Sequence, residues 1–440
     1  MAWYEEAVFY HIYPLGLLGA PEYNDHGAPE HRLPALKEWI FHMKDCGFNA
    51  LYLGPCFSSG SHGYDTSDYR MVDERLGDND DLRELVRVCH EEGIRVILDG
   101  VFNHTGREFF AFRDLKEYRE GSRFRNWYCN VNFWGNNSYD DGFSYDNWGG
   151  HDLLPKLNLY EPEVRNYHFD TIRFWVSEFD IDGLRLDAAD VLDQDFMRDL
   201  RGLADSLKED FWLMGEVIHG EYNRWVNERT LHSVTNYALH KALYSGHNDH
   251  NYFEIAHTIK RMRDMGLGDN VHLYDFVDNH DVERIMTKLN DKRHFLPVHV
   301  LLYTLPGIPS VYYGSEFGLE GRKERGSDAS LRPALSLADL KSRENACLQI
   351  IRALGGIYRR EPALWYGEYR EKELTTTKFA FSRGDLLVTV TNSDAEEYFD
   401  VEMSGAYAGA LSGRKILPDN GRLKFTMEGN SAEIWIPASE

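Results

Sequence analysis

Short apolar runs alternate with longer helical patterns along most of this chain, and this alternation is the feature that most constrains its fold. It is typical of a parallel sheet whose strands are joined by crossover helices. We expect strands near residues 7–13, 49–54, 95–102, 183–188, 211–217, 233–237, 271–278 and 309–313. Eight such strand–helix units predict an α/β fold closed into a (β/α)₈ barrel, the TIM barrel.

One connection departs from this rhythm. The helical segment before strand three, NDDLRELVRVCHEEG, has apolar residues at helical spacing and ends at Gly93, a plausible helix stop. After strand three, the residues between His104 and Glu161 show no clear periodicity and are rich in Asn, Gly and aromatic residues. Loops this long are usually functional or form a small subdomain. We therefore expect an inserted domain B over residues 104–161.

The last part of the chain has a different pattern. After about residue 361, short β-type runs such as TKFAFSR, LLVTVTN and EIWIP are separated by turn residues. This pattern predicts a C-terminal antiparallel β-sandwich over 362–440 and leaves 1–103 and 162–361 for the barrel. A chain of 440 residues, 42% of them hydrophobic, can bury a core of this size.

Composition narrows the classes of partner. A formal net charge of -24 argues against nucleic acid or an anionic membrane and leaves a small neutral or cationic ligand. The N-terminus, MAWYEEAVFYHIYP, lacks a secretory signal pattern, and no stretch approaches a membrane span. The five cysteines are scattered and form no Cys-x-x-Cys pair, which supports neither a disulfide framework nor a zinc site. We expect a cytoplasmic protein, and the oligomeric state stays open.

Charged residues stand where four of the predicted strands end. In GLRLDAAD, residues 183–190, Arg185 and Asp187 share one strand face and the leucines share the other. Strands three, five and seven end in LDGVFNH, LMGEV and FVDNHD. Any one of these could be an ordinary solvated strand terminus. In a barrel, however, the inward face carries charge mainly at the C-terminal mouth, where active sites of this fold lie.

If the four ends meet, three carboxylates would share a small cavity with two histidines. The carboxylates are Asp187, Glu216 and Asp281, and the histidines are His104 and His280. Like charges this close cannot all ionise comfortably, so their pKa values must be driven apart. A protonated carboxyl group beside an ionised one is what glycoside hydrolysis requires.

These strand ends resemble a known family. DGVFNH, GLRLDAAD, GEV and FVDNHD, in this order and spacing, resemble the four conserved regions of the α-amylase family, glycoside hydrolase family 13. HGYDTSDY and GIPSVYYGSEFG resemble further segments of that family. The resemblance covers about residues 7–360. It implies the barrel, the inserted domain B and the C-terminal sandwich.

The resemblance also implies roles for the three carboxylates. Asp187 would be the nucleophile, Glu216 the general acid/base and Asp281 the stabiliser of the transition state. Such a double displacement retains the anomeric configuration, with the two reacting carboxyl groups about 5–6 Å apart.

Further residues are implied to bind the substrate at the cleavage site. Arg185 would hold Asp187 ionised, and His104 and His280 would bind sugar hydroxyls. Tyr64 would stack on the sugar, although a packing role at the mouth of the barrel is its alternative.

Two segments resemble one subgroup of the family. PKLN and EFDIDG resemble segments of neopullulanases, cyclomaltodextrinases and maltogenic amylases, and SDASLRPA carries Asp328 and Arg332 at the spacing those enzymes use on the donor side. This implies short α-1,4-glucans as substrates. The chain departs from the subgroup by starting directly at strand one, without the usual extra N-terminal domain. It also departs by having Asp190 and Val191 on the acceptor side.

No cofactor is expected, although calcium stays possible. Asn103 resembles a calcium ligand of many α-amylases, but one carboxamide does not make a site of six to eight oxygens, and the same residue is structural in many relatives. In the inserted segment, Phe133 and Trp134 could line the cleft or fill a small core.

The sequence is consistent with three functions. The leading one is a retaining hydrolase of short maltooligosaccharides or cyclodextrins. The second is a transglycosylase, or a specialist for sucrose, trehalose or α-1,6 bonds, on the same scaffold. The third is a non-catalytic relative. This last reading is disfavoured because the three carboxylates are present and no membrane anchor is visible.

Overall fold

Eight parallel strands form the centre of the molecule, a computed structural model that describes residues 2–268, 271–343 and 345–438. Their spatial order is β8-β7-β6-β3-β2-β1-β10-β9. A parallel bridge between Thr235 and Tyr274, just after β8 and on β9, brings the two edges together and closes the sheet. The bounds are β1 (Phe9–Ile12), β2 (Ala50–Leu53), β3 (Arg95–Gly100), β6 (Gly183–Leu186), β7 (Trp212–Gly215), β8 (Ser233–Val234), β9 (Tyr274–Phe276) and β10 (Ile308–Tyr312). The predicted (β/α)₈ barrel is confirmed.

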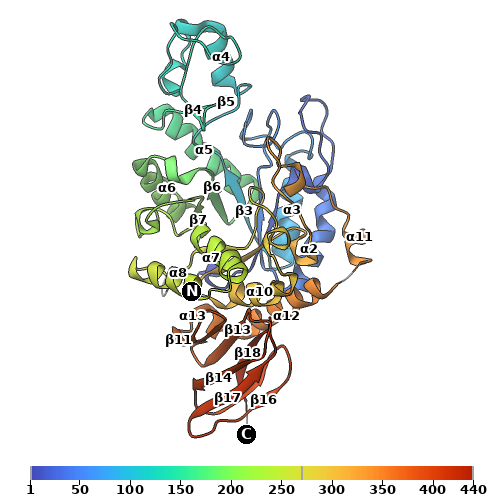
Figure 1. The fold of residues 1–440 in the computed structure, drawn as a ribbon. Helices are drawn as coiled ribbons and strands as arrows, with labels where there is room; N and C mark the ends of the chain where they lie inside the picture. The colour runs from blue at the N-terminus through green and yellow to red at the C-terminus, as the bar shows by residue number, and fades with distance from the viewer. Residues whose placement is uncertain (1, 269–270, 344, 439–440) are drawn as a thin grey trace.

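Helices surround this barrel in the middle of the molecule (Figure 1). The longer ones are α2 (Leu36–Cys46), α3 (Asn79–Glu91), α5 (Pro162–Phe179), α6 (Gln194–Leu207), α7 (Tyr237–Asn248), α8 (Phe253–Asp264), α10 (Phe295–Thr304) and α12 (Ala346–Arg360). Short helices are α1 (Pro14–Leu17), α9 (Ile285–Lys288), α11 (Leu337–Lys341) and α13 (Ala363–Tyr366). Helix α3 begins at a capping box and stops just before Gly93, which has φ 74°, a conformation that glycine adopts without strain.

Side chains alternate between the two faces of the barrel strands. In β7, Leu213 packs outward in the large core between sheet and helices, whereas Trp212 and Met214 point into the barrel. The inward residues near the N-terminal ends of the strands form one apolar cluster, the barrel floor: Ala7, Phe9, Ala50, Tyr52, Ile97, Trp212, Met214, Tyr274, Phe276 and Ile308. The floor is therefore a packed core, as expected for this fold.

The segment after β3 leaves the barrel and forms the upper lobe of Figure 1. It contains α4 (Phe110–Tyr118), β4 (Asn147–Trp148) and β5 (His151–Pro155). Phe133 packs against Phe143 with ring centroids 5.7 Å apart, so it belongs to the small core of this lobe. Trp134 is 99% exposed and lines neither of the two cavities described below, so both expectations for Trp134 were wrong.

The C-terminal strands are antiparallel and form two sheets at the opposite end of the molecule (Figure 1). Their bounds are β11 (Tyr369–Leu374), β12 (Lys378–Arg383), β13 (Leu386–Thr391), β14 (Glu397–Glu402), β15 (Ala406–Gly409), β16 (Lys415–Ile416), β17 (Arg422–Met427) and β18 (Ala432–Ala438). The two-stranded sheet β14–β17 contributes Phe399 and Phe425, and the six-stranded sheet contributes Trp435, to a shared apolar core. The predicted sandwich is confirmed.

Among the helices in the described ranges, none combines the length and the apolar character needed to cross a bilayer. All five cysteines lie in those ranges, and each is free.

Candidate active site

The charged ends of β6 and β7 lie at the C-terminal mouth of the barrel. The backbone N–H of Asp187 donates to the carbonyl of Gly100 (3.0 Å), and that of Glu216 donates to the carbonyl of Leu186 (2.9 Å). The parallel ladder therefore continues one residue past each assigned strand. This continuation keeps the inward alternation, so Arg185 and Asp187 share the face that points into the barrel.

Asp281 reaches the same mouth from a turn after β9. The side-chain oxygen of Asn279 accepts the backbone N–H groups of Asp281 (2.8 Å) and Val282 (3.1 Å). Such an Asx-type turn fixes the backbone where the strand has stopped. FVDNHD thus supplies both the carboxylate and the residue that positions it.

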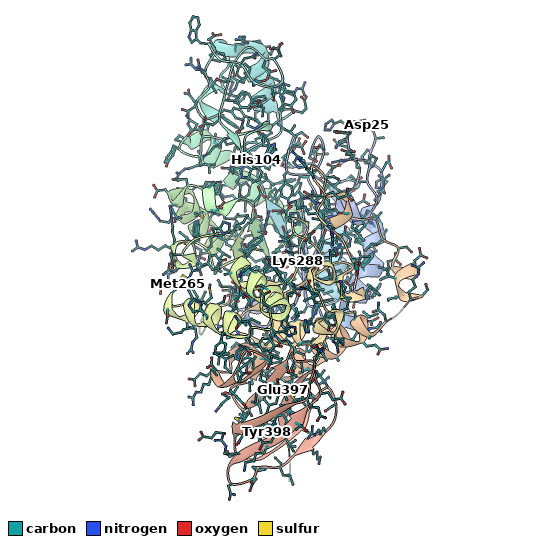
Figure 2. All side chains as sticks on the ribbon, viewed as in Figure 1. Asp25, His104, Met265, Lys288, Glu397 and Tyr398 are labelled. Atoms are coloured by element: carbon teal, nitrogen blue, oxygen red, sulfur yellow. The ribbon has the colours of Figure 1, made fainter. Side chains whose placement is uncertain are left out.

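A single cavity of about 1310 Å³ contains the three carboxylates. Its lining includes seven of the nine residues predicted for the site: Tyr64, His104, Asp187, Glu216, Asp281, Asp328 and Arg332. The other two, Arg185 and His280, are 3% and 2% exposed and contact lining residues from behind. Figure 2 labels His104 at the junction between the upper lobe and the barrel.

Arg185 is the centre of the ionic contacts. Its Nη1 donates to Asp187 Oδ1 (2.9 Å) and to Asp99 Oδ1 (2.8 Å), and its Nη2 lies 3.0 Å from Glu216 Oε2. One guanidinium therefore binds three carboxylates. Because Asp187 and Glu216 meet the same side chain, their carboxyl groups are held close together.

Asp99 is a member of this network that the sequence analysis did not single out. Its Oδ2 accepts hydrogen bonds from the hydroxyls of Tyr52 (2.9 Å) and Tyr64 (3.1 Å), and its side chain is buried. It stands two residues after Ile97, which faces the barrel floor. The alternation that identified Arg185 could therefore have identified Asp99.

Burial sets the proton affinities of the mouth. Desolvation raises the pKa of Glu216 and of Asp99 and raises that of Asp187 well above its usual value, and the positive charge of Arg185 opposes each rise without cancelling it. Three ionised carboxylates around one guanidinium would leave two negative charges without compensation. The group is therefore arranged to hold a proton beside an ionised carboxylate.

A strained backbone residue links two of these acids. Ala188 follows Asp187 with φ 47° and ψ 42°, a left-handed conformation that costs a non-glycine residue about 1–2 kcal/mol. In this conformation its N–H donates to Glu216 Oε2 (3.0 Å). The strain therefore coincides with a contact between the ends of β6 and β7, as is common at functional sites.

Two buried histidines face the carboxylates. His280 Nε2 lies 2.6 Å from Tyr64 Oη and 3.1 Å from Asp281 Oδ2. His104 Nε2 lies 4.0 Å from Asp187 Oδ2 and has no hydrogen-bond partner among the described residues. Burial lowers the pKa of His104 to about 3 and that of His280 well below its usual value, so both rings are neutral near pH 7.

Arg332 connects Asp281 to the predicted donor side. Its Nη2 donates to Asp281 Oδ1 (2.8 Å) and Asp328 Oδ2 (3.1 Å), and its Nε donates to the carbonyl of His280 (3.0 Å). The ammonium of Lys323, which was not predicted, donates to the carbonyl of Asp281 (3.0 Å). SDASLRPA therefore reaches the same cavity as FVDNHD.

Trp148 is a second lining residue that was not predicted. It lies on β4 in the upper lobe, lines the cavity and has its ring centroid 6.0 Å from that of His104. Nothing in the sequence separates Trp148 from the other aromatic residues of the inserted segment. Its position depends on how that segment folds back over the barrel.

The surroundings of Asn103 do not fit calcium. Its buried Oδ1 lacks a hydrogen-bond partner in the described part of the chain, and the same small cavity is lined by Asp190, Asp193 and the ammonium-bearing Lys156. Asp193 already pairs with Arg165 (2.8 Å), and among the described residues no group of three potential metal ligands includes these side chains, so they fall short of the six to eight oxygens that Ca²⁺ takes.

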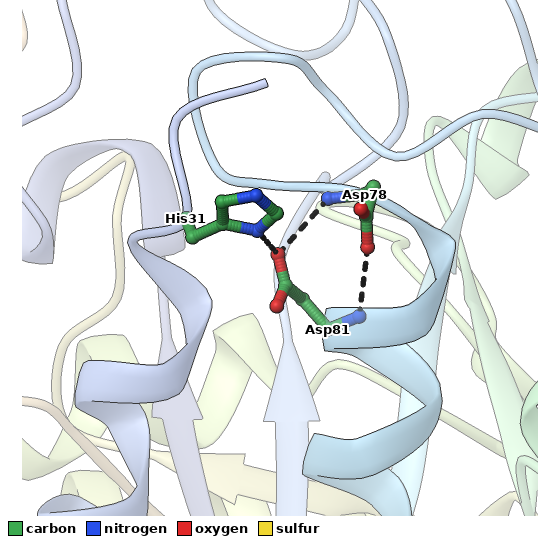
Figure 3. Close-up of side chains that lie close together, drawn as sticks. All are labelled: His31, Asp78 and Asp81. Carbon is green, nitrogen blue, oxygen red and sulfur yellow. Dashed lines mark hydrogen bonds and ion pairs between the residues drawn. The ribbon is translucent and has the colours of Figure 1, made fainter.

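One cluster of potential metal ligands lies elsewhere within the described residues (Figure 3). Asp78 Oδ1 accepts the backbone N–H of Asp81 (3.0 Å), and Asp81 Oδ2 accepts that of Asp78 (3.1 Å) and lies 2.5 Å from His31 Nδ1. These oxygens form the capping box of α3. The cluster is therefore explained as a helix cap.

Comparison with known proteins places these residues in a family context. Residues 35–381 match the family model described as alpha amylase, catalytic domain. The chain is 29% identical to a cyclomaltodextrinase from Bacillus sp, across 94% of this chain and 77% of that protein. It is 30% identical to neopullulanase 2 from Thermoactinomyces vulgaris, across 97% of this chain and 76% of that protein.

A solved structure has the same architecture. The ligand-free cyclic alpha-maltosyl-(1-->6)-maltose hydrolase from Arthrobacter globiformis superposes with a TM-score of 0.83 and 26% identity, covering 99% of each chain. The family match covers most of the chain, including all three carboxylates. The chain therefore belongs to the alpha-amylase family.

Proposed function

We propose that this protein is a retaining α-glucan hydrolase that cleaves α-1,4-glucosidic bonds of short maltooligosaccharides and cyclodextrins. The observation that carries the proposal is the meeting of Asp187, Glu216 and Asp281 in one cavity, with Arg185 bound to the first two. The names of the cyclomaltodextrinase and neopullulanase relatives support the substrate class.

The chemistry would proceed by double displacement. Asp187 attacks the anomeric carbon in its ionised form, which the hydrogen bond from Arg185 Nη1 stabilises, while Glu216 donates its proton to the departing glycosidic oxygen. The glycosyl–Asp187 ester is then hydrolysed by a water that loses a proton to Glu216, and the net anomeric configuration is retained. Arg185 contacts the carboxyl groups of both Asp187 and Glu216. This agrees with the short separation of the two carboxyl groups, about 5–5.5 Å, that is typical of retaining enzymes.

The remaining lining residues would hold the sugar. Asp281, fixed by Arg332, would stabilise the positive charge of the transition state, and His280 would hydrogen-bond a sugar hydroxyl. His104, whose Nε2 is unpartnered, would donate to a sugar hydroxyl, and the ring of Tyr64 would stack on the sugar. Asp328 would bind the donor side beside Arg332.

The test is a product profile for maltotriose through maltoheptaose and β-cyclodextrin. We expect wild type to release products that keep the α configuration, as followed by NMR, and Asp187→Asn to lose at least about 10⁴-fold in kcat. Asp264→Asn, an exposed carboxylate on α8, is the matched control. Equal cleavage by wild type and Asp187→Asn, or inverted products, would refute the assignment.

A second candidate is transfer of the glycosyl group to another sugar. Val191 and Ile218 are apolar, 48% and 42% exposed, and line the same cavity. Apolar surface beside the intermediate favours a sugar over water as the attacking acceptor. Analysis of products at high substrate concentration separates the two: a transferase makes longer chains, and a hydrolase makes reducing sugars only.

We also propose that the protein works in a reducing compartment, the cytoplasm. Five free cysteines, three of them buried, support this location.

A further inference from the structure

The cavity continues beyond the carboxylates along one side of α7. Tyr237, Lys241 and Tyr244, spaced four and three residues apart, line it from that helix. This spacing places them on one helix face. Lys288, the last residue of α9, lines the cavity from a neighbouring element.

The ammonium group of Lys288 forms no direct ion pair with any described residue, and the charge of Glu283 acts on it only at longer range. Its Nζ lies 4.1 Å from the centroid of the Tyr244 ring, and no hydrogen bond or ion pair joins it to any residue that the structure describes. The other cations on this side of the cavity are neutralised, since Lys241 pairs with Glu254 and Arg261 with Glu221. Lys288 therefore keeps its donors available inside the cavity.

Two hydrogen bonds of Asn248 hold the wall around Lys288. Asn248 Nδ2 donates to the carbonyl of Lys288 (2.8 Å), and Asn248 Oδ1 accepts the backbone N–H of Asn290 (2.9 Å). These bonds fix the end of α9 against the end of α7. His240 also lines this part of the cavity, and its buried Nδ1 lacks a hydrogen-bond partner in the described ranges. His240 Nδ1 is itself buried, so Lys288 is the polar group that this wall offers to a ligand.

The position of α7 identifies the side of the cleft. Val217, next to Glu216, donates its N–H to Thr235 Oγ1 (2.9 Å), two residues before α7 begins. Helix α7 therefore starts near the acid that would protonate the leaving sugar. Tyr244 is seven residues farther, about 10 Å along the helix. This is more than the width of one sugar ring.

We propose that Tyr244 and Lys288 form a subsite for a neutral glucosyl unit on the leaving-group side, at least one unit beyond the sugar that Glu216 protonates. The inference rests on the proposed α-glucan hydrolysis. The ammonium covers one face of the tyrosine ring, so hydroxyl groups of the sugar meet its donors and the phenol oxygen. A neutral ligand is favoured over an anion because the nearby carboxylates and the net charge of -24 repel anions.

The experiment compares two substrates that share the bond-breaking chemistry. Maltohexaose has leaving-group sugars that can reach the subsite, whereas α-maltosyl fluoride has none. We expect Lys288→Met to lower kcat/KM for maltohexaose about tenfold more than for α-maltosyl fluoride, a ratio that corresponds to about 1.4 kcal/mol. Tyr244→Leu should shift the ratio in the same direction. Lys260→Met, an exposed lysine on α8 outside the cavity, should not shift it.

Three results would overturn the proposal. An equal loss on both substrates would mean that Lys288 acts on the fold or on the chemistry. Competitive inhibition of wild type by inorganic phosphate, relieved in Lys288→Met, would mean that the site binds anions. If the wild type is inactive on both substrates, the proposed function and the subsite are both refuted. If the wild type is active but Lys288→Met does not change the ratio of kcat/KM for maltohexaose to that for α-maltosyl fluoride, only the subsite is refuted.

Discussion

The floor and the mouth of the barrel are made by the same strands and the same inward face, yet they have opposite chemistry. Along β7, Trp212 and Met214 belong to the apolar floor, and the next inward residue is Glu216. Along β6 the inward residues after Gly183 are Arg185 and Asp187. One alternation rule therefore serves both layers, and the position along the strand decides whether the side chain is apolar or charged.

The two layers also differ in how they affect stability. The floor buries apolar surface, which stabilises the fold by about 25 cal/mol for each Å² removed from water. The mouth buries Arg185 and Asp99, and the desolvation of such charges offsets much of their mutual attraction. The floor thus supports the fold, and the mouth is arranged for chemistry.

The largest expected effect comes from removing the cation of the mouth. Arg185→Met leaves the buried carboxylate of Asp99 without its ionic partner, so we expect a loss of about 3–5 kcal/mol in the free energy of unfolding at pH 7. Hydrolysis should be lost as well. Urea unfolding and maltoheptaose cleavage measure the two effects. Adding Asp99→Leu to Arg185→Met should restore stability but not activity. An Arg185→Met variant as stable as wild type would contradict the prediction.

The next effect concerns the proton on Glu216. Because burial raises the pKa of this carboxyl group, kcat/KM for maltohexaose should fall as the pH rises through that raised pKa. Glu216→Gln should lower kcat/KM for maltohexaose about 10²–10⁴-fold. It should also remove the alkaline limb of the pH profile. α-Maltosyl fluoride, whose leaving group needs no proton, should show a much smaller loss in formation of the glycosyl–enzyme.

The same proton should appear in the stability of the folded state. The folded chain binds it more tightly than the unfolded chain, so its stabilising contribution is complete below a pH of about 4.3 and is lost as the pH rises through the folded pKa. Glu216→Gln should flatten this slope, as measured by urea unfolding at a series of pH values upward from about 4.3. An unchanged slope would assign the proton to another carboxyl group.

A substitution in the floor should separate the two layers. Met214→Ala opens a cavity beneath the mouth, and we expect a cost of about 2–5 kcal/mol in unfolding free energy. The kcat/KM of the folded fraction should stay within about twofold of wild type, since Met214 belongs to the floor and is not among the residues that line the cavity. A large loss of activity would mean that the floor positions the carboxylates.

The smallest effect concerns the strained backbone of Ala188, which links the two carboxyl groups proposed to react. Ala188→Gly relieves a left-handed residue and should raise the free energy of unfolding by up to about 1 kcal/mol. Ala189→Gly, at the neighbouring position with an ordinary negative φ, should lower it by about 0.5–1 kcal/mol and is the matched control. The midpoint of urea unfolding distinguishes the two, and a loss in both variants would show that the left-handed residue carries little strain.

Much of the barrel could be predicted because its periodicities are local. The alternation of Leu184 and Leu186 with Arg185 and Asp187 specifies which side chains face inward, and closure of the sheet brings the strand ends together. Asp99 obeys the same rule and was within reach of the same reasoning.

The path of the upper lobe could not be predicted in this way. Trp134 is exposed while Trp148 lines the cavity, although both lie in the same aromatic-rich segment. Their difference arises from long-range contacts, such as the bridge between His104 and Lys156 that returns the lobe to the barrel. Such contacts cannot be predicted from the composition or the residue spacing of the segment. The unpartnered Lys288 was likewise invisible, because only the fold shows which charges lack a neighbour.

The attachment of the upper lobe has a consequence for how substrate preference can diverge. Two backbone hydrogen bonds join its ends. The N–H of Leu157 donates to the carbonyl of Asn103 (2.9 Å), and the N–H of Thr105 donates to the carbonyl of Pro155 (3.1 Å). Insertions or replacements between these clasped ends can reshape the rim around Trp148 while the reacting groups below keep their places. New specificities can therefore arise by replacement of the upper lobe above a barrel mouth that does not itself change.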